Sequence, residues 1–280
     1  MACIPQAELC CGTGLMAAGT KMDIRIRHHT QTFFINKKKH ESLYMKKRTK
    51  PSHGFTLIEL MIAMAIFSIA SAALYASYQA QQHSYHTQEQ VSDMQQNLRA
   101  ALFFIERDVK MAGYDPRQKA DAASNGNNIA SVAEFRFARD NDGDGVVQNG
   151  EFVRYALTND ADGDGRADGA PCHLGRETGI APSNSGLEPV ADNIDAMELL
   201  YHLADGTVTT NPANPEDIRS IEISLLVRTD ETIRGYIDTA TYFPASHYIS
   251  GVETVWGPFN DPRQRKLLIT EVKCRNLGVL

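Results

Sequence analysis

The chain has 280 residues, of which 42% are hydrophobic and 22% charged, an ordinary globular composition with room for one large or two modest domains. Charge is unevenly placed, because residues 1–54 hold ten of the 28 Lys and Arg but three of the 34 Asp and Glu. The acidic remainder argues against a nucleic-acid partner, whose phosphates need a basic face.

A long apolar run follows residue 54. Residues 55–78 contain one charge, Glu59, and as a helix they would extend about 36 Å, enough to cross a bilayer. Lys and Arg precede the run and are absent between Phe55 and Arg99, which predicts a cytoplasmic N-terminus. A signal peptide cleaved near residues 70–72 and a plain membrane anchor are alternatives. Both leave Glu59 unexplained, since a carboxylate in hydrocarbon costs on the order of a few kcal/mol.

The stretch Gly54-Phe55-Thr56-Leu57-Ile58-Glu59-Leu60 resembles the processing site of type IV prepilins and of type II secretion pseudopilins. The resemblance implies that a prepilin peptidase cuts after Gly54 and methylates the new N-terminal Phe55. It also implies that Glu59 docks subunits by neutralising the N-terminal amine of a neighbour in the fibre. A buried amine and a buried carboxylate can offset each other's desolvation when they meet.

The predicted leader, residues 1–54, is long for this family. Met45 would instead begin the ten-residue basic leader MKKRTKPSHG, which is typical. We therefore expect Met45 to be the true start and residues 1–44 to be translated upstream sequence. Their lack of sustained hydrophobic periodicity agrees with this expectation.

The helix is expected to continue beyond the membrane segment, because no Pro or Gly interrupts residues 55–112. Steps of three and four residues predict an amphipathic helix over residues 79–113, whose apolar face packs on its own domain. Gly113 is the predicted C-cap, and Pro116 prevents the helix from resuming. The apolar face comprises Val91, Met94, Leu98, Leu102, Ile105, Val109 and Ala112.

Two further stretches resemble one subgroup of these proteins. Residues 105–116 (IERDVKMAGYDP) are similar to the end of the first helix in PilW-like minor pilins, and residues 271–278 (EVKCRNLG) to the closing strand of that group. The resemblance implies a minor type IV pilin in the inner membrane that later enters the pilus fibre. Its implied partners are the prepilin peptidase, other major and minor pilins and the inner-membrane assembly platform. A J-type minor pseudopilin and a membrane-anchored, calcium-dependent adhesin are the alternatives.

After residue 113 the pattern changes to short alternating runs separated by Gly, Pro, Asn and Asp, which predicts antiparallel strands. The expected fold is α+β, a type IV pilin-like long helix packed on an antiparallel sheet, with a head over residues 114–280. Extended loops are expected at residues 181–193 and 205–217. The predicted strands are 135–137, 152–155, 197–203, 221–227, 236–242 and 267–272.

Residues 140–151 (DNDGDGVVQNGE), here called the first Asp loop, satisfy the D-x-D-x-D-G-x5-E pattern of a calcium loop. Carboxylates at positions one, three and five converge on a cation, and Gly145 at position six permits the sharp turn. Because strands are expected on both sides, we predict a calcium-binding hairpin loop rather than an EF-hand. The predicted ligands are Asp140, Asp142, Asp144, the carbonyl of Val146, Gln148 and Glu151.

Residues 160–168 (DADGDGRAD), here called the second Asp loop, repeat the pattern, but position twelve falls on Pro171. Solvated turns are the alternative explanation of both loops. Crowded carboxylates repel one another, so the loops are expected to be ordered only when filled. The predicted ligands are Asp160, Asp162, Asp164, the carbonyl of Arg166, and Asp168.

The cysteines and the motifs of common enzymes give further expectations. A disulfide between Cys172 and Cys274 is one hypothesis for an exported head, and two unpaired thiols are the alternative. No CxxC or Cys/His metal spacing occurs, so zinc is not expected. GxSxG, HExxH and P-loop motifs are also absent from the sequence, and we expect no enzymatic activity.

Overall fold

The structure is a computed structural model that describes residues 54–180, 186–249 and 254–278. The predicted leader up to residue 53, with the expected start at Met45, lies outside the described residues.

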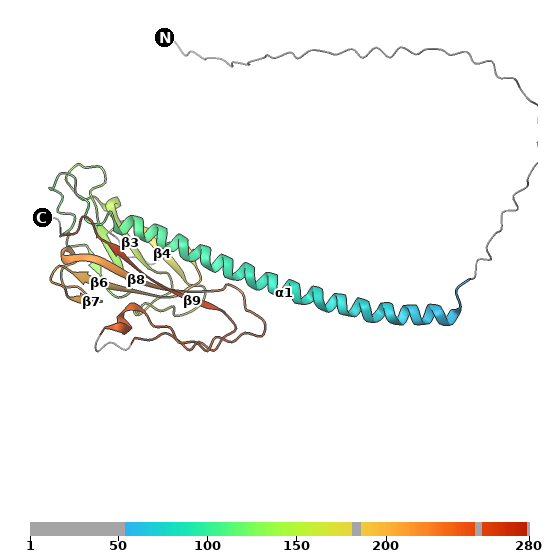
Figure 1. Cartoon of the computed structure of the whole chain (residues 1–280). Helices are drawn as coiled ribbons and strands as arrows, with labels where there is room; N and C mark the ends of the chain where they lie inside the picture. The colour runs from blue at the N-terminus through green and yellow to red at the C-terminus, as the bar shows by residue number, and fades with distance from the viewer. Residues whose placement is uncertain (1–53, 181–185, 250–253, 279–280) are drawn as a thin grey trace, which may run out of the picture. The chain divides into compact units, whose positions relative to one another are not determined.

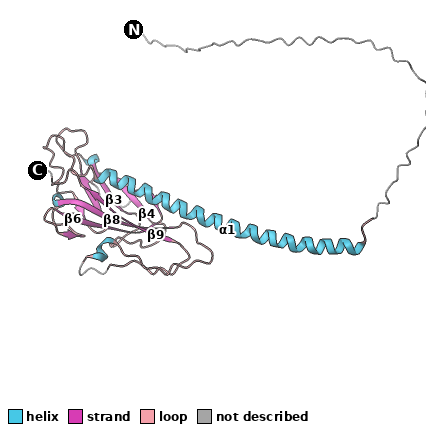
Figure 2. Ribbon diagram, viewed as in Figure 1, coloured by secondary structure: helices cyan, strands magenta, loops and turns pink. Residues whose placement is uncertain are grey.

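One long helix, α1 (Leu57–Val109), joins the apolar run to the head (Figures 1 and 2). The regular helix is shorter than the predicted 55–113 at both ends. Beyond its end the chain forms a turn of 3-10 type, because the Met111 and Ala112 amides donate to carbonyls three residues earlier at 3.0 and 3.1 Å. Gly113 then adopts the left-handed φ of +74° expected of a C-cap. The Asn276 side chain donates to the Lys110 carbonyl at 2.9 Å, which satisfies an acceptor that the helix end leaves open.

The head contains two antiparallel sheets where a single sheet was expected. The first is a meander in the order β1-β2-β3-β4-β5, and the second has the order β7-β6-β8-β9. The first comprises β1 (Ile129–Ala130), β2 (Phe135–Ala138), β3 (Phe152–Leu157), β4 (His173–Thr178) and β5 (Glu188–Asp192). The second comprises β6 (Ile194–Leu203), β7 (Val208–Thr209), β8 (Ile218–Arg228) and β9 (Arg265–Lys273).

The C-terminal half of α1 packs on both sheets and forms one hydrophobic core with them. Figure 2 shows the strands gathered along this half of the helix. The predicted apolar face is confirmed in outline. Ala101 is buried where Leu102 was expected, and a charged residue, Asp108, is buried on the same face. The buried apolar side chains of α1 are Met94, Leu98, Ala101, Ile105 and Val109.

Part of the predicted strand pattern is wrong. Residues 236–242 form no regular strand: Tyr242 makes an isolated bridge to Trp256, and the Asp238 backbone hydrogen-bonds to Asn260 and Asp261. Buried Asp238 explains the difference, because its carboxylate accepts hydrogen bonds from Arg265 and from the Tyr242 hydroxyl. The chain therefore folds around an ion pair rather than along a ladder.

The predicted loops also contain structure that was missed. The loop expected at 181–193 contains β5, although residues 181–185 lie outside the described residues. The loop expected at 205–217 contains β7 and a 3-10 turn, Pro215–Asp217. β5 and β7 are short edge strands, which leave little periodicity to detect.

Of the two alternatives for Cys172 and Cys274, the structure has the unpaired thiols and not the disulfide. Cys172 and Cys274 are both free and buried in the main hydrophobic core. Each thiol therefore packs as a small apolar group.

Candidate functional site

The proposed processing residues lie at the exposed start of the described chain. Gly54 and Phe55 precede α1, and Phe55 is 87% exposed. A Cβ added at Gly54 would meet no atom within 4 Å. Glu59 lies in the first turn of α1, where the partial positive charge of the helix N-terminus favours a carboxylate.

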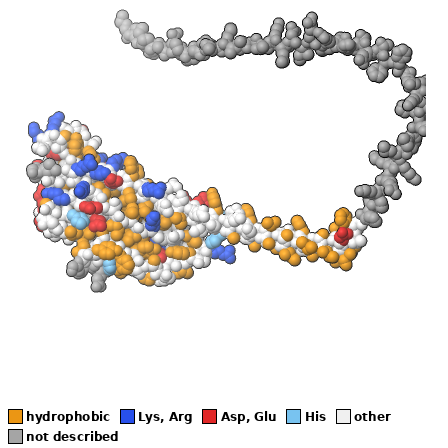
Figure 3. All heavy atoms as spheres, viewed as in Figure 1, with side chains coloured by type: hydrophobic (Ala, Val, Ile, Leu, Met, Phe, Trp, Pro, Cys, Tyr) orange, Lys and Arg blue, Asp and Glu red, His pale blue; other side chains and the backbone are white. Residues whose placement is uncertain are grey.

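The first half of α1 presents an apolar surface to its surroundings. Helix α1 is long and apolar enough to cross a membrane, and the side chains of its most apolar stretch are exposed. Figure 3 shows hydrophobic side chains along the part of α1 that extends away from the head. So large a contiguous apolar patch marks a surface that a membrane or partner helices cover. Among the exposed side chains are Leu57, Ile58, Leu60, Met61, Ile62, Met64, Ile66, Phe67 and Ile69.

The first Asp loop connects β2 to β3, which pair antiparallel with Ala138 opposite Phe152. It is therefore the hairpin loop predicted from the sequence. The carboxylates of Asp140, Asp142 and Asp144 offer oxygens that lie within 4.8 Å of one another. Carboxylate oxygens in such a cluster are the ligands that Ca²⁺ prefers.

Glu151, by contrast, points its carboxylate at the backbone. Its Oε1 accepts the Asn141 amide at 2.6 Å, and its Oε2 accepts the Gln148 amide at 2.9 Å. The Gln148 side-chain nitrogen lies 2.8 Å from Oδ2 of Asp144. Val146 is exposed, and its amide donates to Oδ1 of Asp144 at 2.8 Å. Glu151 therefore closes the loop by binding amides, and the convergent carboxylates are the three aspartates.

The second Asp loop connects β3 to β4 and is also a hairpin loop, since Leu157 lies opposite Leu174. Oxygens of Asp160, Asp162 and Asp168 lie within 4.8 Å of one another. Asp164 instead accepts the Arg166 amide at 2.8 Å.

The two loops share one hydrogen-bond pattern. In each, the first Asp accepts two glycine amides, at 2.6 and 2.9 Å for Asp140 and at 2.8 and 3.0 Å for Asp160. Asp168 Oδ2 accepts the Ala161 amide at 2.6 Å, the same position in the loop as the amide that Glu151 binds. Position nine therefore takes over a contact that position twelve makes in the first loop.

The carboxylates of the second Asp loop repel one another. Burial raises the pKa of the Asp160 carboxyl, and the negative charges of Asp164 and Asp162 raise it further, despite the two glycine amides. A cation among these carboxylates would remove that repulsion.

One charged cluster was not predicted from the sequence. Arg228 at the end of β8 lies directly opposite Arg265 at the start of β9. Like charges in that position repel, and Asp195 lies between them, 3.2 Å from Arg228 Nε and 2.6 Å from Arg265 Nε. The three residues are far apart in the sequence, so only the strand register brings them together.

Comparisons with known proteins agree with the N-terminal geometry. Residues 49–75 match the family model of the prokaryotic N-terminal methylation motif, a span that includes Gly54, Phe55 and Glu59. Among solved structures, a type IV-like pilin from Thermus thermophilus matches 65% of this chain and 97% of its own, with 17% identity and a TM-score of 0.40. No curated protein matches the chain.

The chain thus carries the methylation motif of prokaryotic prepilin-like proteins at the start of a long apolar helix. The expected α+β fold, a long N-terminal helix followed by an antiparallel head, is confirmed.

Proposed function

We propose that this chain is a minor type IV pilin of the PilW family that acts in the assembly or initiation of the pilus rather than in catalysis. The match of residues 49–75 to the methylation motif is the observation that carries the proposal. The exposed apolar half of α1 supports it, because a membrane and later a bundle of neighbouring helices can cover that surface.

In this proposal a prepilin peptidase cuts the chain after Gly54 and methylates Phe55. Before extraction, α1 crosses the inner membrane once, with its N-terminus in the cytoplasm and the head outside. The assembly platform then moves the chain into a fibre with other pilins. Glu59 faces the amine of a neighbouring subunit there, so that neither charge is buried alone.

Cleavage can be tested with Gly54→Ala. The added methyl group meets no atom within 4 Å, so the head and α1 should fold unchanged. The peptidase, which must approach the backbone closely at this glycine, should no longer cut. Gly126→Ala is the matched control, because Gly126 is also exposed with open space around it. Intact mass of the purified chain distinguishes the two, and normal cleavage of Gly54→Ala would contradict the assignment.

Docking can be tested with Glu59→Gln. Processing should continue, because the cut precedes α1, while incorporation into fibres should fail when the amine loses its counter-charge. Glu89→Gln is the control, since Glu89 is an exposed glutamate on the same helix. Immunoblots of cell and sheared-fibre fractions measure both steps. Normal incorporation of Glu59→Gln would remove the role proposed for that carboxylate.

We also propose that both Asp loops bind calcium and that the ion stabilises the head. The three convergent carboxylates of each loop support this. In the first Asp loop, a half-turn of the Gln148 amide would place its oxygen where its nitrogen now lies, since the two ends of an amide are assigned by their contacts.

The pseudopilin alternative has the same processing chemistry, so a deletion strain separates it. Loss of surface pili with normal secretion of exoproteins supports the pilin, and the reverse result supports a J-type pseudopilin. Retention of both, with loss of calcium-dependent attachment, would support a membrane-anchored adhesin.

A further inference from the structure

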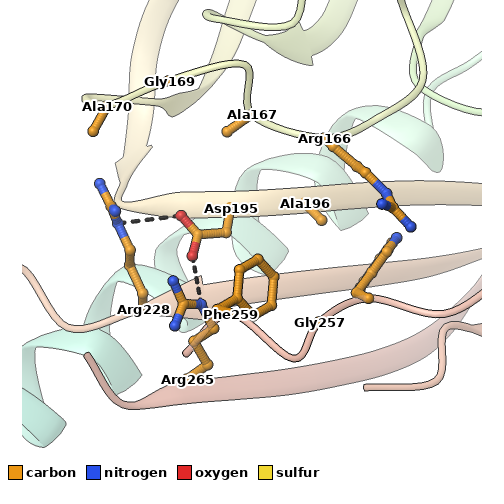
Figure 4. Close-up of a pocket in the computed structure, with 11 residues that line it drawn as sticks. Arg166, Ala167, Gly169, Ala170, Asp195, Ala196, Arg228, Gly257, Phe259 and Arg265 are labelled. Atoms are coloured by element: carbon orange, nitrogen blue, oxygen red, sulfur yellow. Dashed lines mark hydrogen bonds and ion pairs between the residues drawn. The ribbon is translucent and has the colours of Figure 1, made fainter. Parts of the chain in front are cut away.

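A cavity of about 380 Å³ opens between the second Asp loop and the second sheet. Figure 4 shows its walls. They come from residues 166–170, from β6 and β8 near Asp195 and Arg228, and from residues 256–259. A cavity of this size is in the range of small-molecule sites, which combine apolar walls with a few convergent polar groups.

One wall carries arginines paired with aspartates. Arg265 is fully engaged, because Asp195, Asp238 and Asp261 all bind its guanidinium. Arg228 has a weaker partner set. Its side chain is 11% exposed, and Asp195 is its one ion-pair partner among the described residues. The Nε of Arg228 is enclosed and faces an Asp195 oxygen 3.2 Å away, whereas its terminal nitrogens are not enclosed and make no hydrogen bond to a described residue.

Figure 4 shows the Arg228 side chain extending toward Ala170 at the cavity rim. Arg166 lines the cavity from another side and donates to the carbonyl of Val255. The lining therefore holds three arginines and one aspartate, in a chain whose formal net charge is −6. Of the three, only Arg228 has no described acceptor at either terminal nitrogen, and such donors favour a ligand that brings an anionic oxygen.

Aromatic rings adjoin the arginines. Phe259 lies under the Arg265 guanidinium, 3.8 Å from carbon to ring centroid, and Trp256 lines the cavity beside it. Between the rings and the loop the lining is small, which is what leaves space for a ligand. The small lining residues are Ala167, Gly169, Ala170, Ala196 and Gly257.

We propose that this cavity binds a small organic carboxylate with a compact apolar body. The carboxylate accepts hydrogen bonds from Arg228, and the body lies against Phe259 and Trp256. The terminal nitrogens of Arg228 thereby gain an acceptor that no described residue supplies. At these nitrogens the ligand carboxylate replaces water with a charged acceptor, which makes a stronger hydrogen bond than a neutral one.

The chain offers an internal reporter, because Trp256 is its one tryptophan. The full processed chain in nanodiscs is titrated with three probes of equal shape that do not absorb where tryptophan does: cyclohexanecarboxylate, cyclohexylmethanol and cyclohexylmethylamine. The carboxylate should change Trp256 emission saturably. The alcohol should bind at least about tenfold more weakly, because a charged hydrogen bond is lost, and the amine more weakly again.

Arg228→Gln should remove the preference for the carboxylate, and Arg275→Gln should leave it intact because Arg275 is exposed and outside the cavity. The three-probe comparison on the unaltered chain decides the matter alone if Arg228→Gln does not fold. Equal binding of the three probes would overturn the proposal. So would the absence of a saturable change up to about 10 mM, the weakest affinity expected for a ligand of this size.

Discussion

Replacing Asp108 by Asn tests how α1 is held against the first sheet. Asp108 is 1% exposed near the end of the helix. Its Oδ2 accepts hydrogen bonds from Arg176 Nε and from the Tyr155 hydroxyl, both at 2.7 Å. Arg107 and Arg139 lie 3.4 and 3.5 Å from its Oδ1. One carboxylate thus joins the helix to β3 and β4.

The magnitude follows from these contacts. Removing one partner of a buried ion pair costs about 3–5 kcal/mol. Asn retains the shape and one acceptor, and the Arg176 side chain is 20% exposed, so water compensates part of the loss. We expect about 3 kcal/mol, the low end of that range. In a domain of this size that corresponds to a fall in Tm of about 6–12 °C.

The loss should depend on pH. Burial raises the pKa of Asp108, but the Arg176 and Tyr155 hydrogen bonds and the arginine charges outweigh it and hold the pKa below its ordinary value. A folded-state pKa below the unfolded value of about 3.9 contributes stability that is present above that pH and is lost as the pH falls through the folded-state pKa. The difference between the parent chain and Asp108→Asn should therefore be full at pH 7 and shrink below about pH 4.

Thermal unfolding of the full chain, followed by circular dichroism, measures both effects. Asp93→Asn is the control, because Asp93 is exposed on the same helix. An Asp108→Asn variant whose Tm matches that of the control, or whose deficit is the same at pH 3 and pH 7, would refute the reasoning.

Three further predictions concern the head. Gly165→Ala should lower the Tm more than Gly163→Ala. Both residues have a left-handed φ, +81° at Gly165 and +74° at Gly163, so both substitutions strain the backbone. Only at Gly165 does the added Cβ also clash, 2.2 Å from a β6 carbonyl oxygen, because at Gly163 it meets nothing within 4 Å. Cys172 and Cys274 should resist alkylation until the chain is denatured, because both side chains are buried. Burial also raises the pKa of both thiols, that of Cys274 to about 12. Rapid labelling of the native chain, detected by mass spectrometry, would contradict this. Asp142→Ala, which removes the ligand oxygens, should lower the calcium stoichiometry of the chain by one in calorimetric titration, and an unchanged stoichiometry would contradict calcium binding through Asp142 in the first Asp loop.

The sequence predicted the helix and the second sheet better than the first sheet. The strands β6 and β8 are rich in apolar residues that pack into the core, so their pattern survives in the sequence. β4 carries Arg176 and Glu177, and Glu177 is buried. Arg154 of β3 binds Glu177 at 3.1 Å and Glu134 at 2.8 Å. Leu174 is the one residue of β4 in the main hydrophobic core, so β4 has no apolar period to detect.

The methylation motif could be recognised from the sequence because it occupies one short stretch, residues 49–75. Gly54, Phe55 and Glu59 all fall within it, so their spacing is visible before the fold is known. The cavity near Arg228 was not predictable, because its walls come from residues up to 99 positions apart in the chain, from Arg166 to Arg265. A spacing pattern carries no information about such a site before the strand register is known.

The Asp loops show what a spacing motif measures. By sequence the second Asp loop is incomplete, because position twelve is Pro171. In space, Asp168 closes it by the same amide contact, at the same 2.6 Å, that Glu151 makes in the first Asp loop. Asp168 also lies within the carboxylate cluster of its loop, whereas Glu151 lies outside the cluster of its own. By spacing, the first Asp loop fits the calcium pattern better than the second. By geometry, the two loops fit equally well, because the pattern gives the position of each acidic residue in the chain but not the position of its carboxylate oxygens in space.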